Sequence, residues 1–541
     1  MLRRIAAALV LPSVAVLAIA GCGGTSGGDS GSSTGASGTA TSLNPRGAPA
    51  AGATFSYAIG TDPGALDPAT NITSEATRLF TFAYDFVVVP DADNRIVGNL
   101  ATRWRVAPRV VTFQIRDDVT CSDGSPVTPS VIGQNLEYFQ SPDVQYPALG
   151  TLDYRVAADD ARGRLTIRFG EPTPFVLQAL GFVPIVCGRG LRDRSLLKRQ
   201  TSGSGPFVLS EAVPNDHYAF DVREGYRWGP DGAATSDPGT PARLVLRVVP
   251  NETTSANLLL SGDLTAAVVR GSEQTRLTAQ KAPSLAKALG ITQMFFNEAD
   301  GRPAADPAVR RALTMATDRA SVAKVGKGTV GDSIMAPALN PCPAPAQGDA
   351  IPAYDPGAAA QLLDEAGWRK GGDGVRVKDG QRLEIRMLGL TGIGTALRAG
   401  TELIAQSWRD LGIDVETRVM AEGPAVESLS DGSWDAFPLL NVGTTAPSQF
   451  VPFVSGATPP KGSNWGHVEN AAYDRLVAEA ATTVGEEATC RKWDEAEAAL
   501  VGAADVVPMV ALDTVWFTDG TTSFEVSGLG IVPTSIRMHE G

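Results

Sequence analysis

The chain has 541 residues, enough for three or four domain-sized units, and its 43% hydrophobic and 19% charged residues are ordinary for a globular protein. Its 46 Lys and Arg against 59 Asp and Glu give a net charge of −13, which repels phosphates and excludes a general nucleic-acid-binding role. The three His residues lie far apart in sequence, which argues against a His-based metal cluster or His-dependent catalysis.

The N-terminus has the pattern of a secretory signal. Arg3 and Arg4 precede an apolar run over residues 5–20. That run is shorter than the roughly 20 apolar residues of a membrane-spanning helix. It ends in LAIAGC at residues 17–22, which resembles a bacterial lipobox with Cys22 as the lipid-bearing residue. We therefore expect a lipoprotein signal peptide over residues 1–22, and a plain signal peptide with an unmodified Cys is the alternative.

Residues 23–52 are rich in Gly, Ser, Thr and Ala and carry few apolar side chains. Such a stretch cannot bury enough apolar surface to order itself, so we predict a flexible tether. No later segment is apolar for long enough to span a membrane. The expected arrangement is a lipid anchor, a tether and an acidic body on the extracytoplasmic face of the cell membrane.

Strands and helices alternate along the body, which predicts a mixed α/β fold. The pattern predicts strands over residues 54–59, 110–116, 165–169, 243–249, 383–388 and 413–419. It predicts helices over residues 130–139, 307–324, 356–366, 395–411, 472–481 and 489–501. Asp306 and Asp355 each precede a Pro and are predicted as N-caps. We predict a local ion pair between Asp318 and Arg319.

With Cys22 assigned to lipid, an even number of four cysteines remains, Cys121, Cys187, Cys342 and Cys490. In an oxidising compartment this number favours two disulfides, for which three pairings are possible. Four buried thiols are the alternative.

A series of short motifs follows in order along the body, and together they resemble the solute-binding proteins of bacterial ABC importers, in the dipeptide, oligopeptide and nickel-binding family (family 5). The motifs are LDP at 66–68, YD at 84–85, LA at 100–101 with Trp104, TFQIR at 112–116, SDGSPVT at 122–128, GSGPF at 203–207, YRWG at 226–229, SGD at 261–263, FN at 296–297, VRRAL at 309–313, YDP at 354–356, AGW at 366–368 and NWGHVENAAYDRL at 464–476. Each motif alone is weak, and the ordered set carries the resemblance.

The resemblance implies a two-lobed α/β fold of the periplasmic-binding-protein type (type II, cluster C-like) with an extra domain in one lobe. Lobe I would combine residues 53–95, 200–290 and 506–541, with the extra domain at 96–199, and lobe II would span 291–505. Each of the pairs Cys121–Cys187 and Cys342–Cys490 would then lie within one lobe, so we expect this pairing. The implied protein is a monomeric, non-enzymatic binding protein without a cofactor or metal, whose partners are a peptide or other small polar solute and the subunits of a membrane permease.

Peptide binders of this family carry an Asp that pairs with the peptide's α-ammonium, in a "GW.AD" pattern. The corresponding region here is WDAFPLLNVGTTAPSQF at 434–450, where the pattern and its Asp are missing. Neutral side chains favour an uncharged polar group held by hydrogen bonds. Asp62, Asp67 and Glu75 are possible substitute acids. The expected ligand contacts are Asn441, Gly443, Thr444, Thr445, Phe296, Asn297, Ser204 and Trp465.

Two other functions compete with solute binding. A regulatory or scaffold lipoprotein of the cell envelope could share the fold without transporting a solute, and a filled or absent cavity would indicate it. An extracellular hydrolase would need a nucleophile beside a base. The GxSxG patterns around Ser26 and Ser33 lie in the predicted tether, where no strand-to-helix elbow can form.

Overall fold

The computed structural model describes residues 43–541 except residues 46, 72, 142–143, 145–151 and 343–346. The predicted signal peptide, Cys22 and most of the tether therefore lie outside the described residues. Within the described part of the chain, no helix combines the length and the apolar character needed to cross a membrane. We use lobe I for residues 53–290 and 506–541, and lobe II for residues 291–505.

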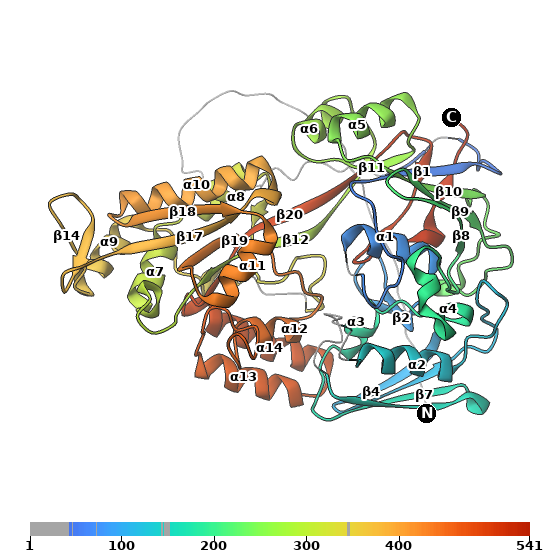
Figure 1. Cartoon of the computed structure of the whole chain (residues 1–541), viewed down its shortest axis with the longest axis horizontal. Coiled ribbons are helices and arrows are strands. Elements are labelled where there is room, and N and C mark those ends of the chain that lie inside the picture. Colours follow the sequence, from blue (N-terminus) through green and yellow to red (C-terminus); the bar gives the residue numbers. More distant parts are fainter. Residues whose placement is uncertain (1–42, 46, 72, 142–143, 145–151, 343–346) are drawn as a thin grey trace, which may run out of the picture. The chain divides into compact units, whose positions relative to one another are not determined.

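One eleven-stranded sheet runs through both lobes (Figure 1). Its order is β18 (Asp414–Met420), β17 (Glu384–Leu390), β19 (Ala436–Leu440), β12 (Ser284–Phe296), β20 (Val506–Thr518), β11 (Ala266–Val268), β1 (Thr54–Ile59), β10 (Arg243–Val248), β9 (His217–Val222) and β8 (Phe207–Val213), with β13 (Thr329–Val330) beside β20. The two longest strands, β12 and β20, pair from Ser284 with Phe517 to Phe295 with Val506. This strand pair connects the two lobes.

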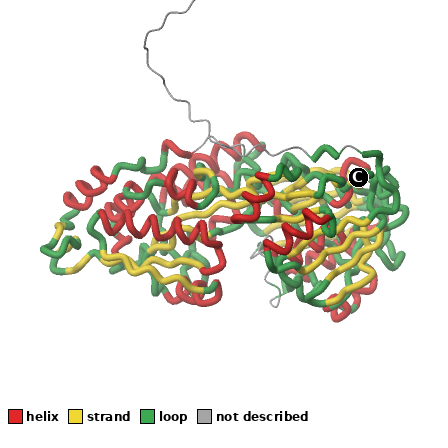
Figure 2. Tube along the Cα trace, turned by 90° about the horizontal axis from the view of Figure 1, so that it is seen from above, coloured by secondary structure: helices red, strands yellow, loops and turns green. Residues whose placement is uncertain are grey.

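Helices surround these strands in both lobes (Figure 2). They are α1 (Ser74–Ala83), α3 (Val176–Leu180), α4 (Gly188–Arg192), α5 (Glu252–Ser261), α6 (Gly271–Ala279), α7 (Pro307–Met315), α8 (Arg319–Val325), α9 (Pro356–Glu365), α10 (Gly394–Asp410), α11 (Glu422–Asp431), α12 (Pro447–Phe450), α13 (Ala471–Thr482) and α14 (Glu486–Gly502). The largest buried apolar cluster fills lobe II and centres on bulky side chains such as Trp408 and Trp434. Burial of this apolar surface is the main favourable contribution to folding.

The extra domain is a four-stranded antiparallel sheet in the order β4 (Ala101–Ala107), β5 (Val110–Ile115), β7 (Arg164–Phe169) and β6 (Tyr154–Asp159). Helix α2 (Pro129–Phe139) covers it, and Ile132, Leu136 and Phe139 of this helix belong to the buried cluster of the domain. Inward-facing apolar residues alternate along β5 and β7, as the pattern of a half-buried sheet requires. The domain lies on the lobe I side of the molecule.

The predicted helix over residues 307–324 is divided into α7 and α8. Asp306 accepts a hydrogen bond from the Ala308 amide and caps α7, as predicted. The division arises because Asp318 leaves helical geometry and its carboxylate accepts from the Ser321 amide at 3.1 Å, which starts a second helix. The predicted Asp318–Arg319 ion pair is therefore wrong, since Arg319 Nε donates to the Pro508 carbonyl at 2.9 Å instead.

The tether ends earlier than the predicted residue 52. Pro49 forms a bridge with His539, and the Ala50 amide donates to the Met538 carbonyl at 2.9 Å. The Glu540 amide donates to the Ala48 carbonyl, so the C-terminal segment satisfies these backbone groups. Leu43 also packs against the lobe I core. Residues 48–50 therefore pair with the C-terminal segment of lobe I and precede its predicted start at residue 53.

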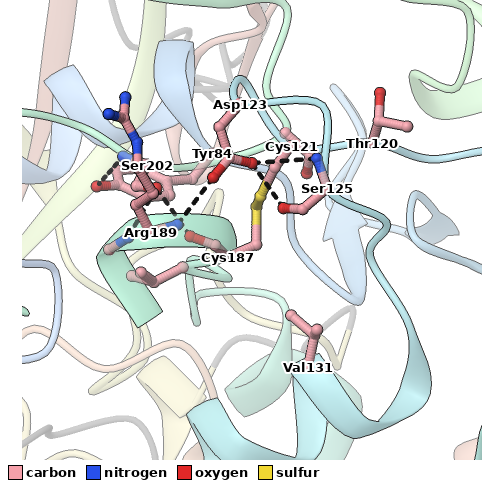
Figure 3. The surroundings of a disulfide bond; sticks show 12 residues. Tyr84, Thr120, Cys121, Asp123, Ser125, Val131, Cys187, Arg189 and Ser202 are labelled. Carbon is pink, nitrogen blue, oxygen red and sulfur yellow. Dashed lines mark hydrogen bonds between the residues drawn. A yellow bond between two sulfur atoms is a disulfide. The ribbon is translucent and has the colours of Figure 1, made fainter. Parts of the chain in front are cut away.

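The structure joins Cys121 to Cys187 and Cys342 to Cys490, with Cα atoms 6.0 and 5.3 Å apart. Each disulfide lies within one lobe, which is the expected pairing. Beside the first disulfide, Asp123 accepts from the Ser125 hydroxyl at 2.6 Å and from the Arg189 amide at 3.0 Å (Figure 3). The SDGSPVT motif thus forms a turn that is fixed to α4.

Candidate ligand-binding site

Residues 441–446 connect β19 to α12 and are fastened to the strand pair between the lobes. Gln293 of β12 is fully buried, and its side-chain oxygen accepts from the Val442 amide at 3.0 Å. Its side-chain amide donates to the Ile334 carbonyl at 2.7 Å and to the Val442 carbonyl at 3.4 Å. The Gln293 side chain therefore holds the 441–446 segment against β12 and close to the backbone of Ile334.

The four predicted contacts in this segment differ in exposure. Asn441 and Gly443 are exposed, and the Asn441 side chain has no hydrogen bond to another described residue that would restrain it. Thr444 is 8% exposed, and its hydroxyl points to Met335 Sδ at 3.1 Å. The Thr445 amide and hydroxyl both donate to Gln449 Oε1, at 2.9 and 3.1 Å. Asn441 and Gly443 are thus the members of the group with the most surface available to a ligand.

The same part of lobe II touches the extra domain (Figure 1). The Ser448 hydroxyl of α12 donates to the Pro174 carbonyl, just before α3, at 3.4 Å. The rings of Phe175 and Trp493 of α14 are centred 6.0 Å apart. These contacts come from opposite lobes, so the 441–449 segment lies at a meeting of the two lobes.

Three predicted ligand contacts are buried in the protein. Phe296 is 0% exposed and stacks on Trp408, with ring centres 6.5 Å apart. Asn297 is 1% exposed, and its side-chain amide donates to the Trp434 carbonyl at 2.9 Å. Ser204 is 0% exposed. We therefore correct these three assignments, because side chains without solvent access support the fold in this conformation and cannot contact a solute.

Trp465, the remaining predicted contact, is partly buried against the lobe II core. Its ring centre lies 5.1 Å from that of Phe453. This packing anchors the loop before α13, and the exposed part of the ring remains available to a ligand.

The first substitute acid, Asp62, is held by backbone and side-chain donors of lobe I. It accepts from the Gly64 amide at 2.7 Å, the Asn215 amide at 2.5 Å and the Tyr218 hydroxyl at 2.9 Å. Burial by itself would raise the pKa of Asp62, but these hydrogen bonds outweigh it and lower the pKa. Asp62 therefore stabilises lobe I as a carboxylate that already accepts three hydrogen bonds.

The other two substitute acids are paired with arginines. Asp67 of the LDP motif receives two hydrogen bonds from Arg194 and is 8% exposed. Glu75 receives two from Arg78, at 2.8 and 2.9 Å. Arg194 uses two nitrogens for the two Asp67 oxygens, a bidentate geometry that is strong and specific, whereas Arg78 contacts both Glu75 oxygens through Nη1 alone. A ligand ammonium would have to compete with these guanidinium groups.

The site therefore offers uncharged hydrogen-bonding groups. No residue from 441 to 449 is charged, and the available donors and acceptors are amides, hydroxyls and backbone groups. The described residues contain no group of three or more His, Cys, Asp or Glu side chains that could hold a metal ion. Asp494, which follows Trp493 in α14, is half-buried, and burial raises its pKa.

Sequence reasoning missed Gln293, Gln449 and the cross-lobe pair of Phe175 and Trp493. One signal was present for Gln293, because a long polar side chain next to a run of apolar residues (MFF at 294–296) needs a specific partner when it is buried. No local pattern marks Phe175 or Trp493, because their contact depends on the position of two separate domains.

A sheet shared by two lobes, with an uncharged segment at their contact, defines a two-lobed α/β binding protein. The chain belongs to the bacterial extracellular solute-binding proteins, family 5, because the family model described as "Bacterial extracellular solute-binding proteins, family 5 Middle" matches residues 95–461. Members of this family act outside the cytoplasm as solute-binding proteins.

Relatives and solved structures agree with this assignment. The nickel-binding periplasmic protein of Escherichia coli is 25% identical over 62% of this chain and 65% of its own length. The oligopeptide-binding protein AppA of Bacillus subtilis is 27% identical over 56% of this chain and 54% of its own length. The matched regions thus span less than two thirds of these relatives.

Among solved structures, a substrate-binding protein of Microbacterium hydrocarbonoxydans, in complex with 4-hydroxybenzoate hydrazide, is 26% identical. The match has a TM-score of 0.71 and covers 90% of this chain and 100% of that one. The structure of AppA with a nonapeptide, at 18% identity and a TM-score of 0.69 over 92% and 100% of the two chains, shares the fold.

Proposed function

We propose that this protein is the solute-binding component of an ABC importer, anchored by lipid at Cys22 on the outer face of the cell membrane. It captures a peptide or peptide-like polar solute between its lobes and delivers it to a membrane permease, without catalysis. Family membership and the peptide-binding relatives support this role. Closure of two lobes on a ligand is a general way to bury a solute and present a new surface to a partner.

The observation that carries the ligand class is the uncharged 441–449 segment, fixed by Gln293 and exposed at Asn441 and Gly443. A free ammonium buried beside it would find no carboxylate within the segment, and the three acids named as possible substitutes, Asp62, Asp67 and Glu75, are already hydrogen-bonded in lobe I. An unpaired buried charge is strongly unfavourable, whereas an uncharged amide or hydroxyl can be satisfied by Asn441. The solute should therefore present an uncharged polar end to this segment, as an N-blocked peptide does.

Calorimetric titration with a matched pair of peptides, one with a free N-terminus and one N-acetylated, tests this assignment. The acetylated peptide should bind about tenfold or more tightly than the free one. Asn441→Asp should reverse that preference, and Asn441→Ala should weaken both. Ser430→Asp, at an exposed position of α11, adds the same charge elsewhere and should change nothing. Equal binding of both peptides by the unaltered protein would contradict the assignment.

Native mass spectrometry of the gently purified protein identifies the solute class directly. An adduct that disappears on denaturation indicates a working solute binder, and its mass distinguishes a peptide from a sugar or lipid fragment. A protein that carries no adduct and binds neither peptide would favour a weak binder or the alternative role, a regulatory lipoprotein of the cell envelope. Detergent-phase partition of the protein and of Cys22→Ala tests the anchor, since the variant should move to the aqueous phase.

A further inference from the structure

A partly open cavity of about 270 Å³ lies in lobe I, and no residue of the 441–449 segment lines it. Its walls come from the end of α1, the hairpin of β2 (Val88–Pro90) and β3 (Ile96–Gly98), residues 226–233 and the C-terminal residues 525–537. No residue between 291 and 505 lines it. Binding in this cavity would therefore require lobe I alone.

The surface of the cavity is mostly apolar, although polar residues also line it. Its apolar lining residues include Val89, Val97, Leu529, Ile531, Val532 and Pro533. An apolar cavity of about 150 Å³ already accepts a benzene molecule. The lobe I cavity therefore has room for a ring with a branched substituent, and it provides the mostly apolar lining that is typical of small-molecule sites.

The buried polar groups around Asp85 in the cavity wall already have partners. Asp85 accepts from the Tyr226 hydroxyl at 2.9 Å, the Trp228 indole at 2.8 Å and the Asn99 amide at 3.1 Å. Burial raises the pKa of Asp85 against the effect of these hydrogen bonds. The donors of Tyr226 and Asn99 are thus not free for a ligand, and a polar ligand atom beside them would be desolvated without compensation.

The charged groups at the wall disfavour an anion. Four acidic residues line the cavity, the hydrogen-bonded Asp85 and the three residues Asp91, Asp231 and Glu525. Arg537 is the one cationic side chain among the described lining residues, and it is engaged by Asp237 at 3.0 Å and by the Thr534 carbonyl at 2.8 Å. An anionic group would meet like charge here, whereas a hydroxyl or an amine would not.

From this lining we propose that lobe I binds a second, small ligand: an aromatic or branched aliphatic molecule whose polar end is neutral or cationic. This inference goes beyond solute capture between the lobes. It predicts a site that is occupied whether or not the lobes close and that does not depend on Asn441.

The test uses three probes with one apolar body: 4-isopropylbenzyl alcohol, 4-isopropylbenzylamine and 4-isopropylbenzoate. Saturation-transfer NMR should give similar affinities for the alcohol and the amine, and an affinity about tenfold or more weaker for the benzoate. Val532→Trp, which fills the cavity from a partly exposed position, should weaken the alcohol about tenfold. Val106→Trp, exposed on β4 and outside the cavity, is the matched control and should bind as before.

Two further variants keep the test decisive. Val89→Phe makes a smaller change in the same wall and should also weaken the alcohol, so the result does not depend on one bulky residue. Asn441→Ala should leave alcohol binding unchanged, which separates this site from the one between the lobes. The proposal would be overturned if the benzoate bound as tightly as the alcohol, or if the alcohol bound both cavity variants as it binds the unaltered protein. Either result would count independently of the calorimetric titrations with the two peptides.

Discussion

Replacing Glu497 by Gln isolates the pH dependence that one buried carboxyl imposes on stability. Glu497 lies in α14 and is 8% exposed. Its two oxygens accept from the Ile334 amide at 2.7 Å and from the Ser333 hydroxyl at 3.1 Å. Burial raises the pKa of Glu497 from its ordinary 4.5 to about 7, and the two hydrogen bonds only partly oppose this effect.

The direction of this pH dependence follows from the number of protons that Glu497 binds in the folded and unfolded states. Between pH 4.5 and 7, the folded state keeps a proton on Glu497 that the unfolded chain has released. Stability from this group is therefore fully present below pH 4.5 and is lost as the pH rises through 7. A pKa difference of about 2.5 corresponds to about 3 kcal/mol. Glu497→Gln, which is always neutral and has a similar shape, should match the unaltered protein near pH 4.5 and exceed it by about 1–3 kcal/mol at pH 8.

Denaturant unfolding followed by Trp fluorescence at several pH values between 4.5 and 8 measures this difference. The quantity to compare is the free energy of unfolding of the variant minus that of the unaltered protein, so that the other carboxyls cancel. Glu486→Gln, at an exposed acid in the first turn of the same helix, controls for the loss of one charge. A difference for Glu497→Gln that stays constant with pH would refute the reasoning.

Three other substitutions test the connections described above. Gln293→Ala leaves the Val442 amide and the Ile334 carbonyl without partners, so it should lower the free energy of unfolding by about 2–4 kcal/mol and weaken solute binding in calorimetry. Cys342→Ser opens a loop with a sequence separation of 148 and should lower stability in thermal unfolding by about 3–5 kcal/mol; no loss would mean that the bond is absent in solution. Gly203→Ala would place a Cβ 2.4 Å from the Ala83 carbonyl oxygen and should destabilise by about 1–3 kcal/mol, whereas Gly423→Ala enters open space and should not.

Much of the fold follows from local patterns. The predicted strands and helices match observed elements to within a few residues, because apolar periodicity and the caps at Asp306 and Asp355 act over one or two turns. The exception is the break at Asp318, whose side chain caps a new helix and so interrupts the predicted one. The apolar spacing over residues 307–324 is compatible both with one long helix and with two short ones. The early end of the tether also escapes prediction, because Ala50 is ordered by a partner almost five hundred residues away.

The candidate site was less predictable. The motif at 434–450 indicated that residues 441–445 belong to the candidate site. It did not indicate which of these side chains are exposed to solvent. Phe296 and Asn297 stand in a motif, and their role is packing and backbone support, which a motif alone does not distinguish from ligand contact. The Phe175–Trp493 contact joins two domains and leaves no trace in the sequence near either residue.

The position of β20 has a consequence for how the chain acquires its structure. This strand follows every other strand of its sheet in sequence, yet it lies between β12 and β11 in the interior of the sheet. Until residues 506–518 have been synthesised, the edge of β11 that pairs with β20 in the finished sheet has no partner. The strand pairing that connects the two lobes is also missing. Assembly of the sheet therefore waits for residues 506–518, and an unfinished chain presents an unpaired strand edge that invites aggregation. Folding of the central sheet is therefore expected to follow the synthesis of residues 506–518.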